Sequence, residues 1–262
     1  MPEVLTSTRS PRVQAVRRLT RRSARVAERR FVVEGPQAVR EALPTLVELY
    51  ADPDGQQRFA ELLAAAPCPV TPVSRDVLAA MAETVTPQGV LGVAPLVDVP
   101  LAQALTGSPR LVPVLVATQD PGNAGTVIRT ADAAGADAVV LTDGSTDPHG
   151  GKCVRATAGS LWHLPVVHGP TLEQTVTAAR AAGLQVLATT GSGRDDLDDL
   201  MDAGALAAPT AWLLGNEASG LPDDALALAD RTVRIPLRGR AESLNLATAA
   251  AVCLYASARA QR

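Results

Sequence analysis

The stretch Leu111–Gly135, LVPVLVATQDPGNAGTVIRTADAAG, decides the fold of this 262-residue chain. It opens with an apolar run over residues 111–117 that has the length and β-branched character of a buried strand. A turn cluster of Asp, Pro, Gly and Asn follows, and apolar residues at helical spacing then predict a helix over residues 123–134. Asn123 is the expected N-cap of this helix and Gly135 the residue that ends it. The stretch therefore predicts one strand–helix unit of an α/β fold.

Arg129 is the unusual residue of this predicted helix. It lies within two turns of the expected N-terminus, where the helix dipole disfavours a cation. A cation in that position is expected to meet an anion. An ordinary strand–helix unit with a surface arginine is the alternative that this stretch alone leaves open.

Strand and helix patterns alternate from residue 111 onward. Further strands are expected at 138–142, 165–168, 185–190, 210–214 and 232–236, and further helices at 152–160, 171–182, 222–228 and 244–260. This alternation predicts a parallel sheet that is covered by helices on both faces. Ligands of such sheets bind at the carboxyl ends of the strands.

Two segments precede this sheet, which gives expected domains of 1–30, 31–105 and 106–262. Residues 31–105 alternate short strands and helices, contain no histidine, and predict a small α/β binding module. The stretch 95–113 is rich in proline and resembles a linker, so the boundary is placed near residue 105. Residues 1–30 carry nine arginines and a net charge of +7. Because the whole chain has a formal net charge of −3, residues 31–262 carry a net charge of −10.

The basic extension predicts contact with a polyanion, and nucleic acid is the expected one because the guanidinium fork suits phosphate. An amphipathic helix with a narrow apolar stripe is predicted by Val13, Val16, Leu19 and Val26. A membrane-surface helix would need bulkier apolar residues there. A solvated helix face or a disordered basic tail is the alternative. The arginines expected to contact RNA are Arg17, Arg18, Arg21, Arg22 and Arg25.

Composition argues against several other classes of protein. The apolar runs fall short of the roughly 20 residues that span a bilayer, and no signal peptide is evident. The three cysteines have neither metal-ligand nor disulfide spacing. A cytoplasmic protein without a metal is therefore expected. A Rossmann dinucleotide site is disfavoured, because Gly191-Ser192-Gly193 lacks the third glycine of the G-x-G-x-x-G motif.

Two later stretches join the first in a recognisable order. Residues 212–222 read WLLGNEASGLP, and residues 235–251 read IPLRGRAESLNLATAAA. The patterns N-x5-R from Asn123 to Arg129, L-G-N-E-x-x-G-L, and I-P-L…S-L-N-x-A-x-A resemble the three motifs of the SpoU (TrmH) family of RNA ribose 2′-O-methyltransferases, in the SPOUT superfamily. Residues 152–161 resemble a further segment of this family, with Thr157 and Ser160 in place of the usual Ser and Ala.

This resemblance implies a fold, a cofactor and a reaction. The implied fold is a parallel α/β sheet whose C-terminal part forms a trefoil knot, with a small N-terminal substrate-binding domain. The implied protein is a homodimer with its active site at the subunit interface, and it transfers a methyl group from S-adenosyl-L-methionine to a ribose 2′-hydroxyl of RNA. Among RNAs, 23S ribosomal RNA is favoured over tRNA. The implied cofactor-binding residues are Thr189, Gly191, Leu214, Gly215, Asn216, Ile235, Leu237 and Leu244.

The resemblance also implies a catalytic group, which comprises Arg129, Asn123, Glu217, Ser243 and Asn245. The family assigns to the arginine the activation of the 2′-hydroxyl. A guanidinium is an awkward base because it stays protonated, so a clamp that holds a phosphate and stabilises the developing oxyanion is the alternative. A catalytically inactive RNA-binding protein and a Rossmann dehydrogenase are the rival functions. The inactive protein is expected to have lost Asn123, Arg129 or Glu217.

Overall fold

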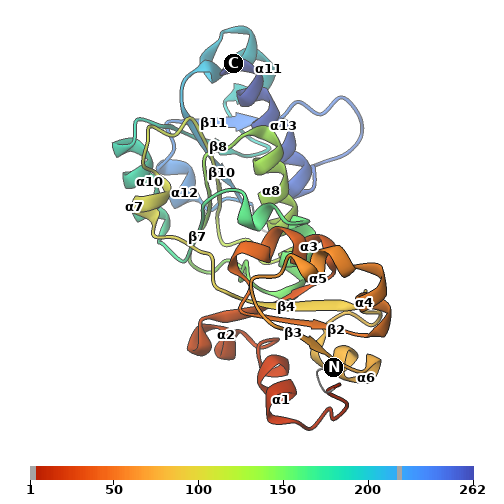
Figure 1. Ribbon diagram of the computed structural model, residues 1–262. Helices are drawn as coiled ribbons and strands as arrows, with labels where there is room; N and C mark the ends of the chain where they lie inside the picture. Colours follow the sequence, from red (N-terminus) through yellow and green to blue (C-terminus); the bar gives the residue numbers. More distant parts are fainter. Residues whose placement is uncertain (1–3, 217–219) are drawn as a thin grey trace. The chain divides into compact units, whose positions relative to one another are not determined.

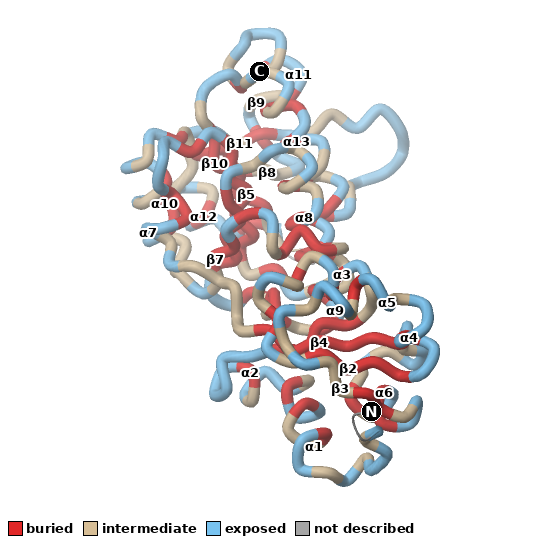
Figure 2. The backbone as a smooth tube through the Cα atoms, viewed as in Figure 1, coloured by how far each residue is buried: buried red, intermediate tan, exposed pale blue. Residues whose placement is uncertain are grey.

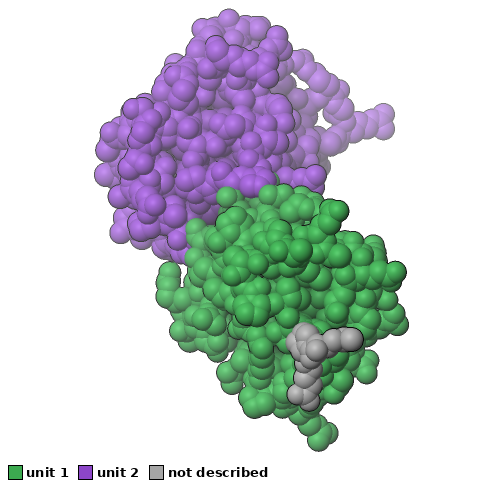
Figure 3. All heavy atoms as spheres, in the orientation of Figure 1, with its two compact units in different colours: residues 1–97, 149–162 green, residues 98–148, 163–262 purple. Residues whose placement is uncertain are grey.

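The computed structural model describes residues 4–216 and 220–262, and the chain forms two compact units. Unit 1 comprises the chain up to Val97 together with His149–Trp162. Unit 2 comprises Asp98–Pro148 and His163–Arg262, and Figure 3 colours the two units separately. The segment that carries Lys152 and Arg155 therefore belongs to unit 1, although it interrupts the sequence of unit 2.

Unit 1 contains a four-stranded sheet in the order β1-β4-β2-β3. Strand β4 pairs antiparallel with β1 and β2, and β2 pairs parallel with β3. Apolar side chains of α1 and α6, such as Val13 and Val77, pack with Tyr50 and Leu91 from the sheet. The strands are β1 (Arg30–Glu34), β2 (Glu48–Ala51), β3 (Val70–Pro72) and β4 (Val90–Pro95). The helices are α1 (Pro11–Arg18), α2 (Arg22–Glu28), α3 (Pro36–Ala42), α4 (Pro53–Arg58), α5 (Ala60–Ala64), α6 (Arg75–Met81) and α9 (Gly151–Thr157), with short 3₁₀ turns η1 (Leu43–Thr45) and η2 (Ser160–Trp162).

The basic extension forms two helices, α1 and α2, and not the single amphipathic helix that the sequence predicts. Arg25 is only 5% exposed, and its Nη1 donates to the carbonyl oxygens of Leu19 and Thr20 at 2.9 Å each. Its guanidinium thus closes the turn between the two helices. This role corrects the expectation that Arg25 contacts RNA. Val26, expected in the apolar stripe, is 60% exposed.

Unit 2 contains a seven-stranded sheet in the order β7-β6-β5-β10-β8-β11-β9, and every neighbouring pair is parallel. The predicted parallel sheet is therefore confirmed. Its central strands are buried (Figure 2), with α8 and α13 on one face and α7, α10 and α12 on the other (Figure 1). The strands are β5 (Leu111–Leu115), β6 (Val139–Leu141), β7 (Val166–His168), β8 (Gln185–Thr189), β9 (Asp195–Asp196), β10 (Thr210–Leu214) and β11 (Arg231–Arg234). The helices are α7 (Leu101–Ala104), α8 (Pro121–Ala134), α10 (Leu172–Ala181), α11 (Leu197–Asp202), α12 (Asp223–Ala227) and α13 (Leu246–Ala260), with a 3₁₀ turn η3 (Ala205–Ala207).

Helix α8 begins two residues earlier than predicted. Asp120 is its N-cap, and one carboxylate oxygen of Asp120 accepts from the backbone N–H of Asn123 at 2.8 Å. The assignment of Asn123 as N-cap is therefore wrong. Asp120 is followed by Pro121, and proline is favoured at the first position of a helix. Gly135 ends the helix with φ 73°, as predicted. Arg129 consequently lies more than two turns along α8, where the helix dipole has little effect, so the dipole argument for an anion near Arg129 does not hold.

Side-chain hydrogen bonds hold strands β8 and β10 of this sheet in place. Oδ2 of Asp230 accepts from the backbone N–H of Val186 at the start of β8, at 2.7 Å. Nε1 of Trp212 on β10 donates to Oγ of Ser257 on α13 at 2.9 Å, and both residues are wholly buried. A buried indole N–H without a partner is costly, so this bond ties α13 to the centre of the sheet. The trefoil knot implied by the resemblance stays a prediction.

Two expectations concern what the molecule lacks. In residues 4–216 and 220–262, no helix is long and apolar enough to cross a membrane. In the same ranges, no three His, Cys, Asp or Glu side chains are grouped so that they could hold a metal ion.

Of the cysteines, Cys253 is wholly buried on α13, and burial raises the pKa of its thiol to about 12.

Candidate active site

The carboxyl ends of β8, β10 and β11 frame a cleft of about 360 Å³ in unit 2. The segment that leads into α13 forms its remaining side, and Ser243 of the predicted catalytic group lies there. Leu214 is the exception among the residues expected to bind a cofactor, because it is wholly buried inside β10. The other seven expected residues all line the cleft: Thr189, Gly191, Gly215, Asn216, Ile235, Leu237 and Leu244.

Two glycines of the cleft have different roles. A Cβ on Gly215 would collide with the carbonyl carbon of Gly220. Asn216 and Gly220 exchange two backbone hydrogen bonds, of 3.1 and 2.9 Å, so Gly215 is required for the loop to close on itself. A Cβ on Gly191, by contrast, would meet no atom within 4 Å. Of these two glycines, Gly191 therefore leaves open space in the cleft that a ligand could occupy.

The side chain of Asn216 connects two strands. Its Nδ2 donates to the carbonyl oxygen of Ala117 at 2.9 Å, just beyond the end of β5. The same carbonyl accepts from Nε2 of Gln119 at 3.0 Å, and the N–H of Ala117 donates to Oγ1 of Thr142 at 3.1 Å. Asn216 thus lines the cleft while its carboxamide positions the end of β10 against the end of β5.

Asn123 and Asn245 come together although 122 residues separate them in the sequence. Nδ2 of Asn245 donates to Oδ1 of Asn123 at 3.0 Å. Oδ1 of Asn245 also caps α13 by accepting from the backbone N–H groups of Ala247 and Thr248, at 2.9 and 3.3 Å. This arrangement orients the amide of Asn123 at the start of α8 and joins α8 to α13.

Arg129 lies exposed on α8. Within the part of the chain that the structure describes, its guanidinium makes no hydrogen bond or ion pair, so no such bond joins it to Asn123, Ser243 or Asn245. Its donors are therefore available to an anionic ligand. Glu217, the remaining member of the expected catalytic group, lies outside the described residues.

Sequence reasoning missed several residues at this edge of the sheet. Thr190 and Glu242 line the cleft, and Ala117 and Thr142 hold the neighbouring strand ends together. Thr190 and Glu242 are direct neighbours of residues that the motifs singled out, so the strand-end rule could have included them. Ala117 and Thr142 carry no sequence signal, because their role depends on which strands are adjacent.

Comparison with known proteins decides the family. The model of the SpoU rRNA methylase family matches residues 110–255, and the model of an MRM3-like substrate-binding domain matches residues 10–92. This chain belongs to the SpoU rRNA methylase family. The two matches confirm the resemblance of the C-terminal part to the SpoU family and the presence of an N-terminal substrate-binding domain.

Three relatives match this SpoU family member over nearly their whole length. The 23S rRNA (guanosine(2553)-2'-O)-methyltransferase RlmP of Bacillus subtilis is 36% identical over 251 residues, which are 95% of this chain and 96% of the relative. The crystal structure of an AdoMet-bound rRNA methyltransferase from Sinorhizobium meliloti superposes with a TM-score of 0.83 at 34% identity, covering 98% of this chain and 97% of that one. The SpoU methyltransferase AviRb from Streptomyces viridochromogenes, in complex with AdoMet, has a TM-score of 0.83 at 30% identity, covering 95% and 98%.

The open space beside Gly191 can be tested directly. We expect Gly191→Val to abolish binding of S-adenosylhomocysteine without lowering the melting temperature, because a Cβ at this cleft-lining position would meet no protein atom within 4 Å and the added side chain would take up space that the ligand needs. Gly239→Val is the matched control, since its Cβ would also meet nothing within 4 Å but the residue does not line the cleft. Isothermal titration calorimetry measures both. Unchanged affinity in Gly191→Val would show that the ligand binds elsewhere.

Proposed function

We propose that this chain is an S-adenosylmethionine-dependent methyltransferase that modifies a ribose 2′-hydroxyl of 23S ribosomal RNA. The observation that carries the proposal is the cleft at the ends of β8, β10 and β11, where seven residues implied by the family motifs meet. The 95% coverage by RlmP, which is named as a 23S rRNA 2'-O-methyltransferase, supports the reaction and the type of RNA. A ribosomal substrate agrees with the cytoplasmic location expected from the sequence.

The residues of the cleft fit the cofactor. Its volume of about 360 Å³ lies within the range of about 300–1,000 Å³ that is usual for small-molecule sites. Ile235, Leu237 and Leu244 offer apolar surface to a purine ring, and the empty side of Gly191 allows close approach to the backbone. When bound, S-adenosylmethionine supplies an electrophilic methyl group on a sulfonium.

The chain's own residues must bind the ribose and manage the charge that develops on its 2′-oxygen. Arg129 can do this as a clamp, because its exposed guanidinium carries five N–H donors and makes no hydrogen bond or ion pair to any described residue. The paired amides of Asn123 and Asn245 and the hydroxyl of Ser243 supply neutral donors and acceptors to orient the ribose. Glu217, which the resemblance implies as a supporting member of the same group, carries a carboxylate that we propose as the acceptor of the proton that leaves the 2′-hydroxyl.

Unit 1 is the proposed RNA-binding part. Arg17 on α1, Arg22 on α2 and the α2 N-cap Arg21 are exposed, and none of them makes an ion pair to any described residue. Arg18 is also exposed and lies 3.6 Å from a carboxylate oxygen of Glu28. The match of residues 10–92 to a substrate-binding domain model supports this role. The domain division 1–30, 31–105 and 106–262 is retained as a proposal for function, with the basic extension as part of the RNA surface.

We infer that the active form is a homodimer that joins through α13. A groove bordered by α8, α11 and α13 leaves Val252 and Tyr255 38% and 52% exposed, which is unusual for residues of their size on a helix packed into the fold. Covering this apolar surface with a second copy of the chain would place two clefts near one interface.

The rival functions make different predictions for ligands. A Rossmann dehydrogenase would bind a nicotinamide cofactor, and an inactive RNA-binding protein would bind neither cofactor nor transfer methyl groups. Asn123 and Arg129 are both present, and the cleft has no dinucleotide fingerprint at its glycines. Titration with S-adenosylhomocysteine and with NAD therefore separates the three functions.

Arg129 provides the main test of the reaction. We expect Arg129→Ala to fold and to bind S-adenosylhomocysteine as the wild type does, because the side chain is exposed. Its rate of methyl transfer to unmodified 23S rRNA should fall by about 10²–10³, the usual effect of removing a donor to a developing oxyanion. Arg129→Lys then separates a point charge, which lysine retains, from the guanidinium fork, which it lacks. Full activity of the alanine variant would remove Arg129 from the mechanism.

The arginines of α1 and α2 are expected to set the salt dependence of RNA binding. The triple variant Arg17→Ala, Arg21→Ala, Arg22→Ala should bind RNA more weakly. The slope of log K against log salt should become shallower by about 0.7 for each phosphate of a single strand that the variant no longer neutralises. A control with equal charge loss replaces Arg75, Arg180 and Arg231, which pair with Asp54, Asp230 and Asp195. Equal slopes for both triple variants, measured by filter binding, would contradict the role of the extension.

The dimer is tested at Tyr255. We expect Tyr255→Arg to sediment as a monomer, because it replaces an exposed aromatic ring by a charge in the groove between α8, α11 and α13. Thr177→Arg, an exposed position on α10, is the control and should leave the sedimentation coefficient unchanged. A wild-type chain that sediments as a monomer at micromolar concentration would disprove the dimer.

A further inference from the structure

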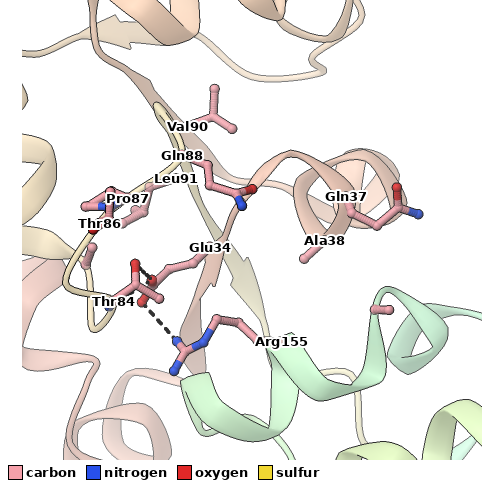
Figure 4. Close-up of a pocket in the computed structure, with 13 residues that line it drawn as sticks. Glu34, Gln37, Ala38, Thr84, Thr86, Pro87, Gln88, Val90, Leu91 and Arg155 are labelled. Carbon is pink, nitrogen blue, oxygen red and sulfur yellow. Dashed lines mark hydrogen bonds and ion pairs between the residues drawn. The ribbon is translucent and has the colours of Figure 1, made fainter.

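A second pocket, of about 260 Å³, lies wholly within unit 1, and none of the sequence motifs gives it a ligand. It is formed by the end of β1, the start of α3, the loop before β4, and α9 (Figure 4). Its size falls below the usual range for drug-sized ligands, about 300–1,000 Å³, and suits a single flat ring.

The pocket is held in shape by Glu34, which is only 8% exposed. Its carboxylate accepts from the backbone N–H groups of Glu83 and Thr84, at 2.6 and 3.2 Å, and from Oγ1 of Thr84 at 2.8 Å. Nη1 of Arg155 on α9 lies 3.5 Å from the same carboxylate (Figure 4). Glu34 therefore fixes the loop and α9 on either side of the pocket and has little capacity left for a ligand.

The groups left for a ligand are Gln88 and Arg155. Neither Gln88 nor the neighbouring Thr86 makes a side-chain hydrogen bond within the described residues, and both line the pocket. Nη1 of Arg155 is buried without a hydrogen-bond partner there, since its carboxylate neighbours, Glu34 and Glu83, lie 3.5 and 3.8 Å away. The pocket thus combines a carboxamide that bonds to no described residue with one guanidinium nitrogen, Nη1 of Arg155, that lacks a hydrogen-bond acceptor among them.

The walls between these polar groups are mostly apolar. Ala38 from α3, Pro87 from the loop, and Val90 and Leu91 from β4 line the pocket. Figure 4 shows the carboxamide of Gln88 directed toward the helix that carries Ala38. Gly35 lies beside it, where a Cβ would come within 3.3 Å of Oε1 of Gln88. An apolar slot with one carboxamide at its edge matches the face and the edge of a nucleobase.

We propose that this pocket holds one unpaired nucleobase of the substrate RNA, with Gln88 hydrogen-bonded to the edge of the base and Arg155 donating to a base carbonyl or phosphate oxygen. The proposal rests on the proposed function for the presence of RNA. A carboxamide carries one acceptor and two donors, so it pairs with the adjacent donor and acceptor of a base edge. The exposed arginines of α1 and α2 on the same unit favour RNA over a free nucleotide as the source of that base.

Thr86→Trp tests the pocket by filling it from the rim. We expect this variant to bind an unmodified 23S rRNA transcript about 5- to 100-fold more weakly, which is the effect of removing one well-made interaction with a base. Val85→Trp is the matched control, because Val85 is fully exposed and does not line the pocket. Both variants should keep the wild-type melting temperature and the wild-type affinity for S-adenosylhomocysteine. Equal RNA affinity for the two tryptophan variants would overturn the proposal.

Gln88 tests how the base edge is recognised. Gln88→Ala should weaken binding to the transcript, whereas Gln88→Glu, which has acceptors only, should shift the preference toward a base with two adjacent donors. A photo-crosslinking phenylalanine analogue at position 86 should mark a single unpaired nucleotide of the transcript, and the same analogue at position 85 should not. This crosslink does not depend on methyl transfer, so it separates failure of the pocket from failure of the proposed reaction.

Free nucleotides are the alternative source of the same chemistry. AMP, GMP, CMP and UMP are titrated separately into the wild type and into Thr86→Trp, and binding is followed by NMR. Saturable binding of a mononucleotide that Thr86→Trp abolishes, while the RNA affinity of that variant stays at the wild-type value, would overturn the proposal in favour of a nucleotide ligand. Weak mononucleotide binding together with a large decrease in RNA affinity supports it.

Discussion

The hydrogen bond from Asn216 to the carbonyl oxygen of Ala117 is the contact on which the candidate active site depends. Ala117 has φ 48°, a left-handed conformation that costs an alanine about 1–2 kcal/mol. Bonds from Asn216 and Gln119 to its carbonyl, and from its N–H to Thr142, hold it there. The ends of β5, β6 and β10 are thereby tied together.

A second set of contacts places the polar residues around the cleft. The buried bond between Trp212 and Ser257 attaches α13 to β10, and Asn245 begins the same helix. Because Asn245 also bonds to Asn123, the start of α8 is tied to the start of α13. The cleft itself is lined largely by glycine and apolar residues, which suits recognition through the backbone, whereas polar side chains come from Asn123 and Asn245 at the starts of the two helices and from Ser243 before α13.

Unit 1 uses its charged residues in two different ways. Arg25 and Glu34 are buried and serve the fold, since each satisfies backbone groups that would otherwise lack partners. Arg17, Arg21 and Arg22 are exposed and leave their charge to a polyanion. The family segment around Lys152 joins this unit through α9, which packs against β1. A segment from the middle of the chain thus supplies Arg155 to a pocket built by the N-terminal residues.

Much of the architecture follows from the sequence. Alternating strand and helix patterns predict the parallel sheet, because a buried strand and an amphipathic helix have different apolar periods. The rule that ligands bind at strand ends, together with the motifs, placed Thr189, Gly191 and Ile235 in one cleft. The start of α8 was missed by two residues, because Asp120 and Asn123 are both good caps and only the backbone decides between them.

Other features were decided by the tertiary structure alone. Arg25 and Arg22 cannot be told apart in the sequence, yet one guanidinium is buried and the other is exposed, because only Arg25 lies over the turn between α1 and α2. Position 215 must be glycine because a Cβ there would collide with the backbone of Gly220. The pocket of unit 1 forms only because the fold brings Gln88 and Arg155 to the same place. Local patterns determine the elements and their strand ends. Which distant side chains share a buried space depends on the order of the strands and on the close packing of the whole chain.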